Sequence, residues 1–159
     1  RHTCNVGNHL TNIAEASRAM GLYEVYKEEF EGRMEQLSKV HLTDKDVDMI
    51  SARALMTDDV WKVYVKADYN INSDDISTRT KNQFEALKQT LYTGVGQDLL
   101  ETNTGLHLYN GITCYLTNVA PKDWSESNKE AEKQFNSLMV GTAYEKQQKA
   151  FELILNKAA

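Results

Sequence analysis

The chain is poor in the residues that interrupt helices and in those that cross-link small folds. Its 159 residues include one proline, Pro121, and two cysteines, Cys4 and Cys114. A single proline and few strand signals favour long helices. Two cysteines fit free thiols in a reducing compartment better than a disulfide scaffold. We therefore expect one helical domain over residues 1–159 and a cytoplasmic setting.

Long apolar runs and basic runs are also missing. The mean hydropathy is −0.57, so no membrane span is expected and no membrane partner. The 18 Lys and Arg are scattered among 23 Asp and Glu, which gives a net charge of −5. Because nucleic-acid surfaces usually show a basic excess, this balance argues against a dedicated one.

The spacings that mark metal, cofactor and catalytic sites do not occur. His107 and Cys114 belong to no Cys-x-x-Cys or His-Glu-x-x-His pattern, so the zinc signal is weak. Asp44, Asp46 and Asp48 are spaced like the start of a calcium loop, but its glycine and glutamate are missing, and a helix start explains these acids. No P-loop, nucleophile elbow or dinucleotide fingerprint is found. We expect no catalytic residue, no metal and no cofactor.

The most informative stretch runs from about residue 102 to residue 120. Apolar residues recur there at steps of three and four, and they are Leu106, Tyr109, Ile112, Leu116 and Val119. That spacing is a helix period. Leu108, Cys114 and Tyr115 fall outside this stripe, so most of the circumference is apolar. A helix of this kind is normally central and buried.

A narrow polar line crosses this apolar helix and consists of Asn103, Asn110, Thr113 and Thr117. Buried amides and hydroxyls cost free energy unless they find partners. Two interpretations remain open. The line is either an interhelical hydrogen-bond ladder that fixes register, or one wall of a ligand site.

The same periodicity predicts helices over about 10–40, 44–56, 76–93, 126–139 and 143–157. The fold class is therefore all-α, with five to six helices packed around the central helix. Thr43 and Asp46 form an N-cap signal for the second helix. Phe84, Leu87 and Leu91 are expected to face inward. The segment near 60–70 is rich in β-branched and aromatic residues, and a short strand or an irregular linker are both open.

The first predicted helix is long, about 45 Å at ~1.5 Å per residue, and could serve as a spine or a dimer arm. One face carries apolar residues at helical steps, namely Ile13, Ala16, Met20, Tyr23, Tyr26, Phe30, Met34 and Leu37. Glycines at positions 21 and 32 each weaken it by roughly 1 kcal/mol relative to alanine, which allows a bend or break.

Aromatic residues near lysines suggest a second kind of site. Trp61, Tyr64, Tyr69 and Trp124, with Lys62 and Lys66, have the chemistry that stacks on and neutralises single-stranded nucleic acid. Aromatic side chains are more often part of a core, and on sequence grounds the core interpretation is favoured.

The stretch from Asn103 to Asn118 resembles the motif of a phage- and plasmid-like family of unknown function. The matching residues are Thr104, Tyr109, Asn110, Thr113 and Tyr115, and with Thr117 they are our candidates for binding or interface residues. Arg1-His2-Thr3 and the stretch 135–150 resemble two further family segments. Leu106, Cys114 and Asn118 depart from the family pattern.

This resemblance implies the C-terminal half of a longer protein whose N-terminal half is mixed α/β. It also implies a role in phage or plasmid DNA metabolism, in a bacterial cytoplasm or a virion. Our first hypothesis is a non-catalytic binding and assembly module that acts with single-stranded DNA and self-associates or binds another phage protein. The alternative is a structural protein–protein module without nucleic-acid binding, and the acidic balance favours it. An enzyme working through Asn110 and Thr113 is the third hypothesis.

Overall fold

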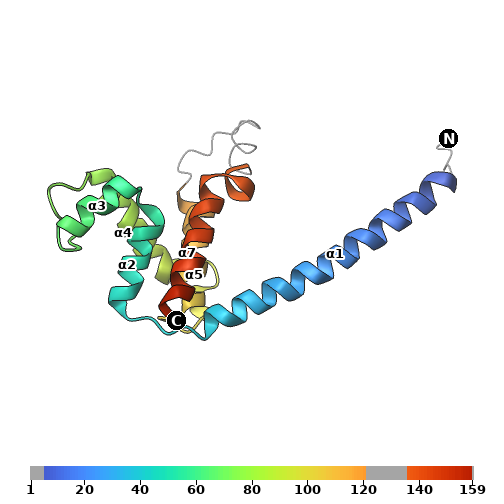
Figure 1. Cartoon of the computed structure of the whole chain (residues 1–159), viewed down its shortest axis with the longest axis horizontal. Helices are drawn as coiled ribbons and strands as arrows, with labels where there is room; N and C mark the ends of the chain where they lie inside the picture. The colour runs from blue at the N-terminus through green and yellow to red at the C-terminus, as the bar shows by residue number, and fades with distance from the viewer. Residues whose placement is uncertain (1–5, 121–135, 159) are drawn as a thin grey trace. The chain divides into compact units, whose positions relative to one another are not determined.

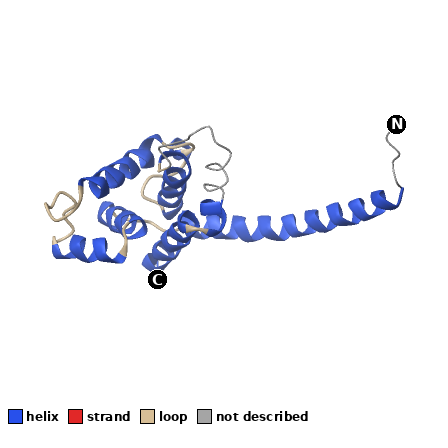
Figure 2. Cartoon of the chain, turned by 90° about the horizontal axis from the view of Figure 1, so that it is seen from above, coloured by secondary structure: helices blue, strands red, loops and turns tan. Residues whose placement is uncertain are grey.

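The computed structural model describes residues 6–120 and 136–158, and every regular element in these ranges is helical (Figures 1 and 2). The α-helices are α1 (Val6–Ser38), α2 (Asp44–Leu55), α3 (Asp58–Lys66), α4 (Thr78–Thr93), α5 (Gly105–Cys114) and α7 (Thr142–Ala158). A 3₁₀ turn, Gln97–Leu99, precedes α5, and a π-helical turn, Tyr115–Val119, follows it. The predicted all-α fold is confirmed.

By its internal contacts the chain divides into two units, residues 1–36 and 37–159. The described part of the first unit belongs to α1, a continuous 33-residue helix. The helix passes through Gly21 and Gly32 without a break. The break that these two glycines allow is therefore absent.

In the second unit α5 is the central element, as its apolar circumference predicts. It packs against α4, α7 and α2. Leu108 and Ile112 are completely buried, and Tyr115 and Leu116 in the π-helical turn are nearly so. Burying a leucine or isoleucine side chain contributes about 1.5–3 kcal/mol, so this short helix anchors the core.

Two glycines let neighbouring elements approach α5 closely. A Cβ atom on Gly105 would lie 2.5 Å from Ile154 Cγ2 and 2.8 Å from the Leu37 carbonyl oxygen. A Cβ atom on Gly111 would lie 2.7 Å from Gln97 Nε2 and also overlap the side chain of Leu91. Neither position can carry a side chain unless its neighbours shift.

The start of α2 confirms the N-cap signal read from Thr43 and Asp46. Asp46 N–H donates to Thr43 Oγ1 at 3.2 Å, and Thr43 N–H donates to Asp46 Oδ2 at 3.1 Å. This is a complete capping box. Asp46 is also tied to the far end of the chain, because Lys157 Nζ on α7 lies 2.8 Å from Asp46 Oδ1.

The capping box predicts an acid-sensitive stability. The hydrogen bond from Lys157, followed by those from Thr43, lowers the Asp46 pKa from 3.8 to about 2. Because the folded-state pKa is the lower one, the stabilisation is complete above the unfolded pKa and is lost as pH falls from about 4 towards 2. Asp46→Asn should cost about 1–2 kcal/mol at neutral pH. Urea unfolding across pH 2–7 checks this, and an equal acid dependence in both proteins would contradict it.

The segment near 60–70 is neither the strand nor the irregular linker that its composition suggests. It folds as α3, with Val60, Trp61 and Val63 packed against a buried cluster that includes Tyr64, Ile76 and Phe84. Burial of this face overrides the strand preference of its β-branched and aromatic residues. The helix ends where Asp68 and Tyr69 adopt positive φ angles of 53° and 59°.

The remaining predicted helices are largely confirmed. Phe84, Leu87 and Leu91 face inward from α4, and Gly94 is its C-cap. Helix α7 begins after Gly141, where the sequence predicts a break, and buries Ala150, Phe151 and Ile154. Residues 136–140 are helical, whereas most of the helix predicted over 126–139 lies outside the described residues.

Candidate functional site

Two residues build the entry to α5, namely Asn103, the first residue of the polar line, and the candidate residue Thr104. Asn103 adopts a positive φ of 62°, and its Nδ2 donates to Asp44 Oδ1 at 2.9 Å. Thr104 is the N-cap, because its hydroxyl accepts from His107 N–H at 3.2 Å and donates to the Glu101 carbonyl at 2.8 Å. Thr104 is 3% exposed. The Thr104 side chain therefore serves the local backbone, whereas the Asn103 side chain links the entry of α5 to α2.

Asn110 and Gln97 form a buried amide network. Asn110 Nδ2 donates to Gln97 Oε1 at 2.8 Å and to the Val95 carbonyl at 3.2 Å. Gln97 Nε2 in turn donates to the carbonyls of Leu91 at 3.0 Å and His107 at 3.1 Å. Gln97 is 3% exposed, so its amide is satisfied by protein atoms. The network joins the end of α4, the 3₁₀ turn and α5.

The other candidate residues on this helix also have packing roles. Thr117 Oγ1 donates to the Thr113 carbonyl at 2.8 Å. Thr113 Oγ1 is buried without a hydrogen-bond partner in the described part of the chain. The Tyr109 ring meets Phe151 of α7 edge-on at 5.9 Å between centroids. Tyr115 is buried, and burial raises the pKa of its phenol.

Together these contacts favour the ladder interpretation of the polar line over the ligand-site interpretation. Asn103 and Asn110 each find a partner on a different segment, and Thr117 bonds within its own helix. Neither of the two cavities described below is lined by any of these residues.

Asn110→Leu tests the ladder. The substitution leaves Gln97 Oε1 buried without its donor, which costs about 1–3 kcal/mol. We expect the free energy of unfolding measured in urea to fall by that amount. Asn118→Leu is the matched control, since Asn118 is exposed and its described hydrogen bond is a long one of 3.5 Å to Cys114 Sγ. Equal stability of the two variants would contradict a structural ladder.

The aromatic residues proposed for stacking are engaged with one another. The rings of Trp61, Tyr64 and Tyr69 lie 5.6–6.2 Å apart between centroids. Tyr64 is 3% exposed, and burial raises its pKa. Trp124 lies outside the described residues. The three described rings fit a core cluster better than a row of stacking platforms.

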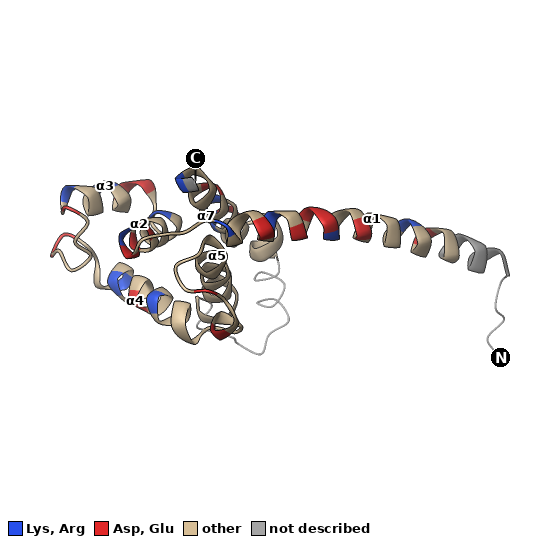
Figure 3. Ribbon diagram, turned by 90° about the horizontal axis from the view of Figure 1, so that it is seen from below, with Lys and Arg blue, Asp and Glu red and all other residues tan. Residues whose placement is uncertain are grey.

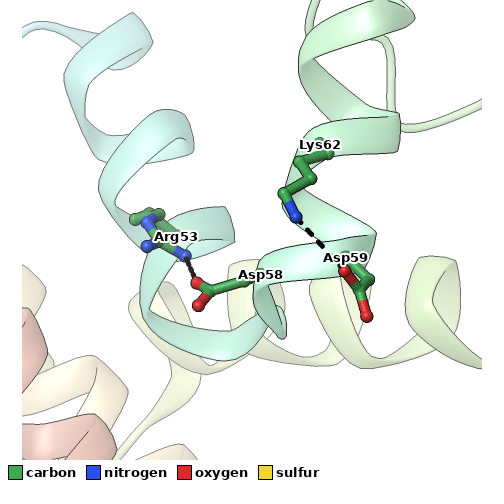
Figure 4. A network of polar contacts seen from close by, with 4 residues as sticks. All are labelled: Arg53, Asp58, Asp59 and Lys62. Atoms are coloured by element: carbon green, nitrogen blue, oxygen red, sulfur yellow. Dashed lines mark hydrogen bonds and ion pairs between the residues drawn. The ribbon is translucent and has the colours of Figure 1, made fainter.

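Several described cations of the second unit are paired with carboxylates or carbonyls. Arg53 Nη1 on α2 donates to Asp58 Oδ1 at 2.7 Å, and Lys62 Nζ lies 3.4 Å from Asp59 Oδ1 (Figure 4). The hydrogen bond from Arg53 holds the pKa of Asp58 below its usual value. Lys88 of α4 pairs with Asp48 of α2. Figure 3 shows basic segments on α4 and acidic segments along α1.

Among the cavities lined by described residues of this unit, two have volumes of about 240 Å³. The first, here called the Trp61 cavity, is lined by Trp61, Ile50, Leu153 and three charged residues, Asp46, Arg53 and Lys157. All three are already in ion pairs, and the Arg53 guanidinium lies 5.4 Å from the Trp61 ring centroid. This cavity therefore presents no unbalanced charge.

The second, here called the Arg79 cavity, lies between α3, α4 and α7. Among the described residues, its charged lining residues are Arg79 and Lys146, and no described carboxylate lines it. Thr57, Thr80 and Gln83 add polar groups, while Met56, Val60 and Phe84 form an apolar side. The cavity combines a hydrophobic wall with positive charge, as small-molecule sites commonly do.

The face of α1 is a different kind of candidate. In unit 1, seven residues along one face of α1 occupy the first and fourth positions of successive heptads, which is a repeat of 3.5 residues. They are Ile13, Ala16, Met20, Tyr23, Lys27, Phe30 and Met34, here called the α1 seam. Met20 is 62% exposed, Tyr23 67% and Phe30 50%. Large apolar side chains exposed in a row mark an interaction surface.

Sequence reasoning missed several of the residues that matter. Gln97, the centre of the amide network, sits in a glycine-containing link and carries no pattern of its own. Arg79 and Lys146 are 67 positions apart in the sequence and meet only through folding. The spacing of the α1 seam, in contrast, could be read from the sequence, because apolar residues of that helix recur there at steps of three and four residues.

Of the two residues weighed above as zinc ligands, His107 is buried and Cys114 is a free cysteine that accepts a hydrogen bond from Asn118 Nδ2. Burial lowers the His107 pKa, partly offset by a hydrogen bond with the Leu91 backbone. Among residues 6–120 and 136–158 no group of three or more His, Cys, Asp or Glu is placed to hold a metal ion.

No helix in the same ranges has the length and apolarity needed to cross a bilayer.

Residues 1–147 match the family model described as domain of unknown function DUF932, and the chain belongs to that family. No curated protein and no solved structure matches it.

Proposed function

We propose that this member of the DUF932 family is a non-catalytic binding and assembly module that self-associates through the α1 seam. The observation that carries the proposal is the row of exposed apolar side chains at heptad spacing. A helix with such a seam gains stability when a second helix covers it, because the heptad repeat keeps the same side chains at the contact over several turns.

The occupant that fits the seam best is a second copy running antiparallel. With the contact centred between Tyr23 and Lys27, the first and fourth heptad positions face each other across a two-fold axis. Met20 then meets Phe30, and the small Ala16 meets the large Met34. Lys27 meets the ring of Tyr23, a favourable cation–π pair. Each contact occurs twice, so the seam is complementary to itself.

Charge supports the same arrangement. Lys27 is the polar residue within the seam, and its Nζ lies 3.6 Å from Glu31 Oε1 of the same helix. The lysine is thus neutralised before association. A polar residue at such a position lowers the stability of a coiled coil but fixes its register.

A narrower version of the proposal places this module in a phage or plasmid protein that handles single-stranded DNA. It is supported by the resemblance of the stretch 103–118. The alternative is a virion-associated or scaffold-like module without nucleic-acid binding, supported by the net charge of −5 and by the pairing of Arg53, Lys62 and Lys88 with carboxylates. Anisotropy titration of labelled single-stranded DNA across a salt series separates the two, because phosphate contacts weaken steeply with salt.

Sedimentation equilibrium of the chain tests self-association. We expect an apparent mass that rises with concentration towards twice the monomer mass of 18.1 kDa. A mass of 18.1 kDa at every concentration would overturn the proposal and leave the seam to a different protein.

A further inference from the structure

We propose that the Arg79 cavity binds the phosphate group of a small ligand. This site is separate from the α1 seam and does not depend on the proposed assembly. The structure brings two cations from distant parts of the chain to one small cavity, Arg79 from the first turn of α4 and Lys146 from α7.

The first argument is the lack of counter-charge. Four cations of the second unit pair with described carboxylates, and they are Arg53, Lys62, Lys88 and Lys157. Within the described part of the chain, Arg79 and Lys146 make no ion pair or hydrogen bond. A positive group held in a cleft without a partner raises the local concentration of anions.

The second argument is the environment of Lys146. Burial lowers the pKa of its ammonium group. The pKa of Lys149, one turn further along α7, is lowered as well, first by burial and then by the charges of Arg53 and Lys146. Asp58 is the carboxylate that opposes this effect. Burial thus disfavours the charged ammonium group of Lys146, and an anion in the cavity would favour it.

The third argument is chemistry and size. A phosphate monoester carries a charge of about −1.5 to −2 at neutral pH, which matches two cations better than a single carboxylate does. The planar guanidinium of Arg79 can donate two parallel hydrogen bonds to phosphate oxygens. A volume of about 240 Å³ lies below the usual range for drug-sized ligands and suits a phosphate with a small attached group. Met56, Val60 and Phe84 offer that group an apolar wall.

Isothermal titration calorimetry with inorganic phosphate and with a nucleoside monophosphate tests the site. We expect saturable binding of both. Arg79→Gln/Lys146→Gln should weaken it at least about tenfold, since both charge-assisted hydrogen-bond donors are removed. Lys66→Gln removes an exposed charge outside the cavity and should leave the affinity within about twofold. Lys146→Arg keeps the charge and should keep binding.

The outcomes are decisive in both directions. The proposal is overturned if inorganic phosphate or the nucleoside monophosphate fails to bind. It is also overturned if the double variant binds with unchanged affinity while its circular dichroism is intact. If the double variant misfolds, loss of binding in Arg79→Gln alone, with Lys146→Arg still binding, supports the site. A single-stranded oligonucleotide is the comparison ligand. Tighter binding of the monophosphate identifies a small-molecule source, whereas tighter, salt-sensitive binding of the oligonucleotide identifies a phosphate of the nucleic-acid backbone.

Discussion

Met20→Lys/Tyr23→Lys is expected to convert the chain to a monomer of 18.1 kDa at concentrations where the unmodified chain self-associates. Both residues belong to the α1 seam and are 62% and 67% exposed. In the antiparallel pair each lysine would be placed in the apolar contact twice. Burying an unpaired ammonium costs several kcal/mol, so the apparent dissociation constant should rise by more than about 100-fold. Light scattering after gel filtration measures the mass.

The chain offers a closely matched control in Leu22→Lys/Val25→Lys. Leu22 and Val25 are 67% and 65% exposed, but they occupy outer heptad positions away from the seam. This variant has the same added charge and the same loss of exposed apolar surface, and it should remain associated. If both double variants become monomers, general hydrophobic contact rather than a heptad seam holds the copies together.

Gly111→Ala is expected to destabilise the second unit by about 2–4 kcal/mol, although it adds a single methyl group to a helix. A Cβ atom there would lie 2.7 Å from Gln97 Nε2 and would overlap Leu91. Gln97 cannot easily move, because its amide is fixed by the Leu91 and His107 carbonyls and by Asn110. The cost combines overpacking of about 1–3 kcal/mol with a weakened hydrogen bond of about 1 kcal/mol. Urea unfolding followed by tyrosine and tryptophan fluorescence measures it.

Gly21→Ala gives the opposite sign and serves as the control. No atom lies within 4 Å of the position of its Cβ, so the substitution removes a helix-weakening residue and nothing else. It should increase the stability of α1 by about 0.5–1 kcal/mol and leave the urea midpoint of the second unit unchanged. A stability loss at both glycines would mean that propensity arguments fail here, and a gain at both would mean that the packing around Gly111 is loose.

Elements with a strong apolar period could be predicted from the sequence, and elements defined by tertiary contacts could not. The central helix was predictable because its apolar residues leave no solvated face. Helix α3 was not, because Val60, Trp61 and Val63 have strand preferences that are outweighed by burial against Tyr64 and Phe84. The N-cap of α2 was predictable because Thr43 and Asp46 are close in sequence and bond directly.

The candidate sites divide in the same way. Asn110 and Thr104 were found because polar residues stand out on an apolar helix, but their roles depend on Gln97 and Glu101, which no pattern marks. The Arg79 cavity could not be predicted, because the two cations come from helices that are far apart in the chain. The α1 seam needed no tertiary information. Its heptad spacing is contained in residues 13–34.

Hydrogen–deuterium exchange of residues 13–30 would locate the contact between copies. The measurement compares the unmodified chain with the seam variant and the outer-face control described above. We predict slow exchange in the unmodified chain and the control, and fast exchange in Met20→Lys/Tyr23→Lys, because a solitary helix with few buried contacts opens readily. Equal exchange of residues 13–30 in all three proteins would contradict assembly through α1.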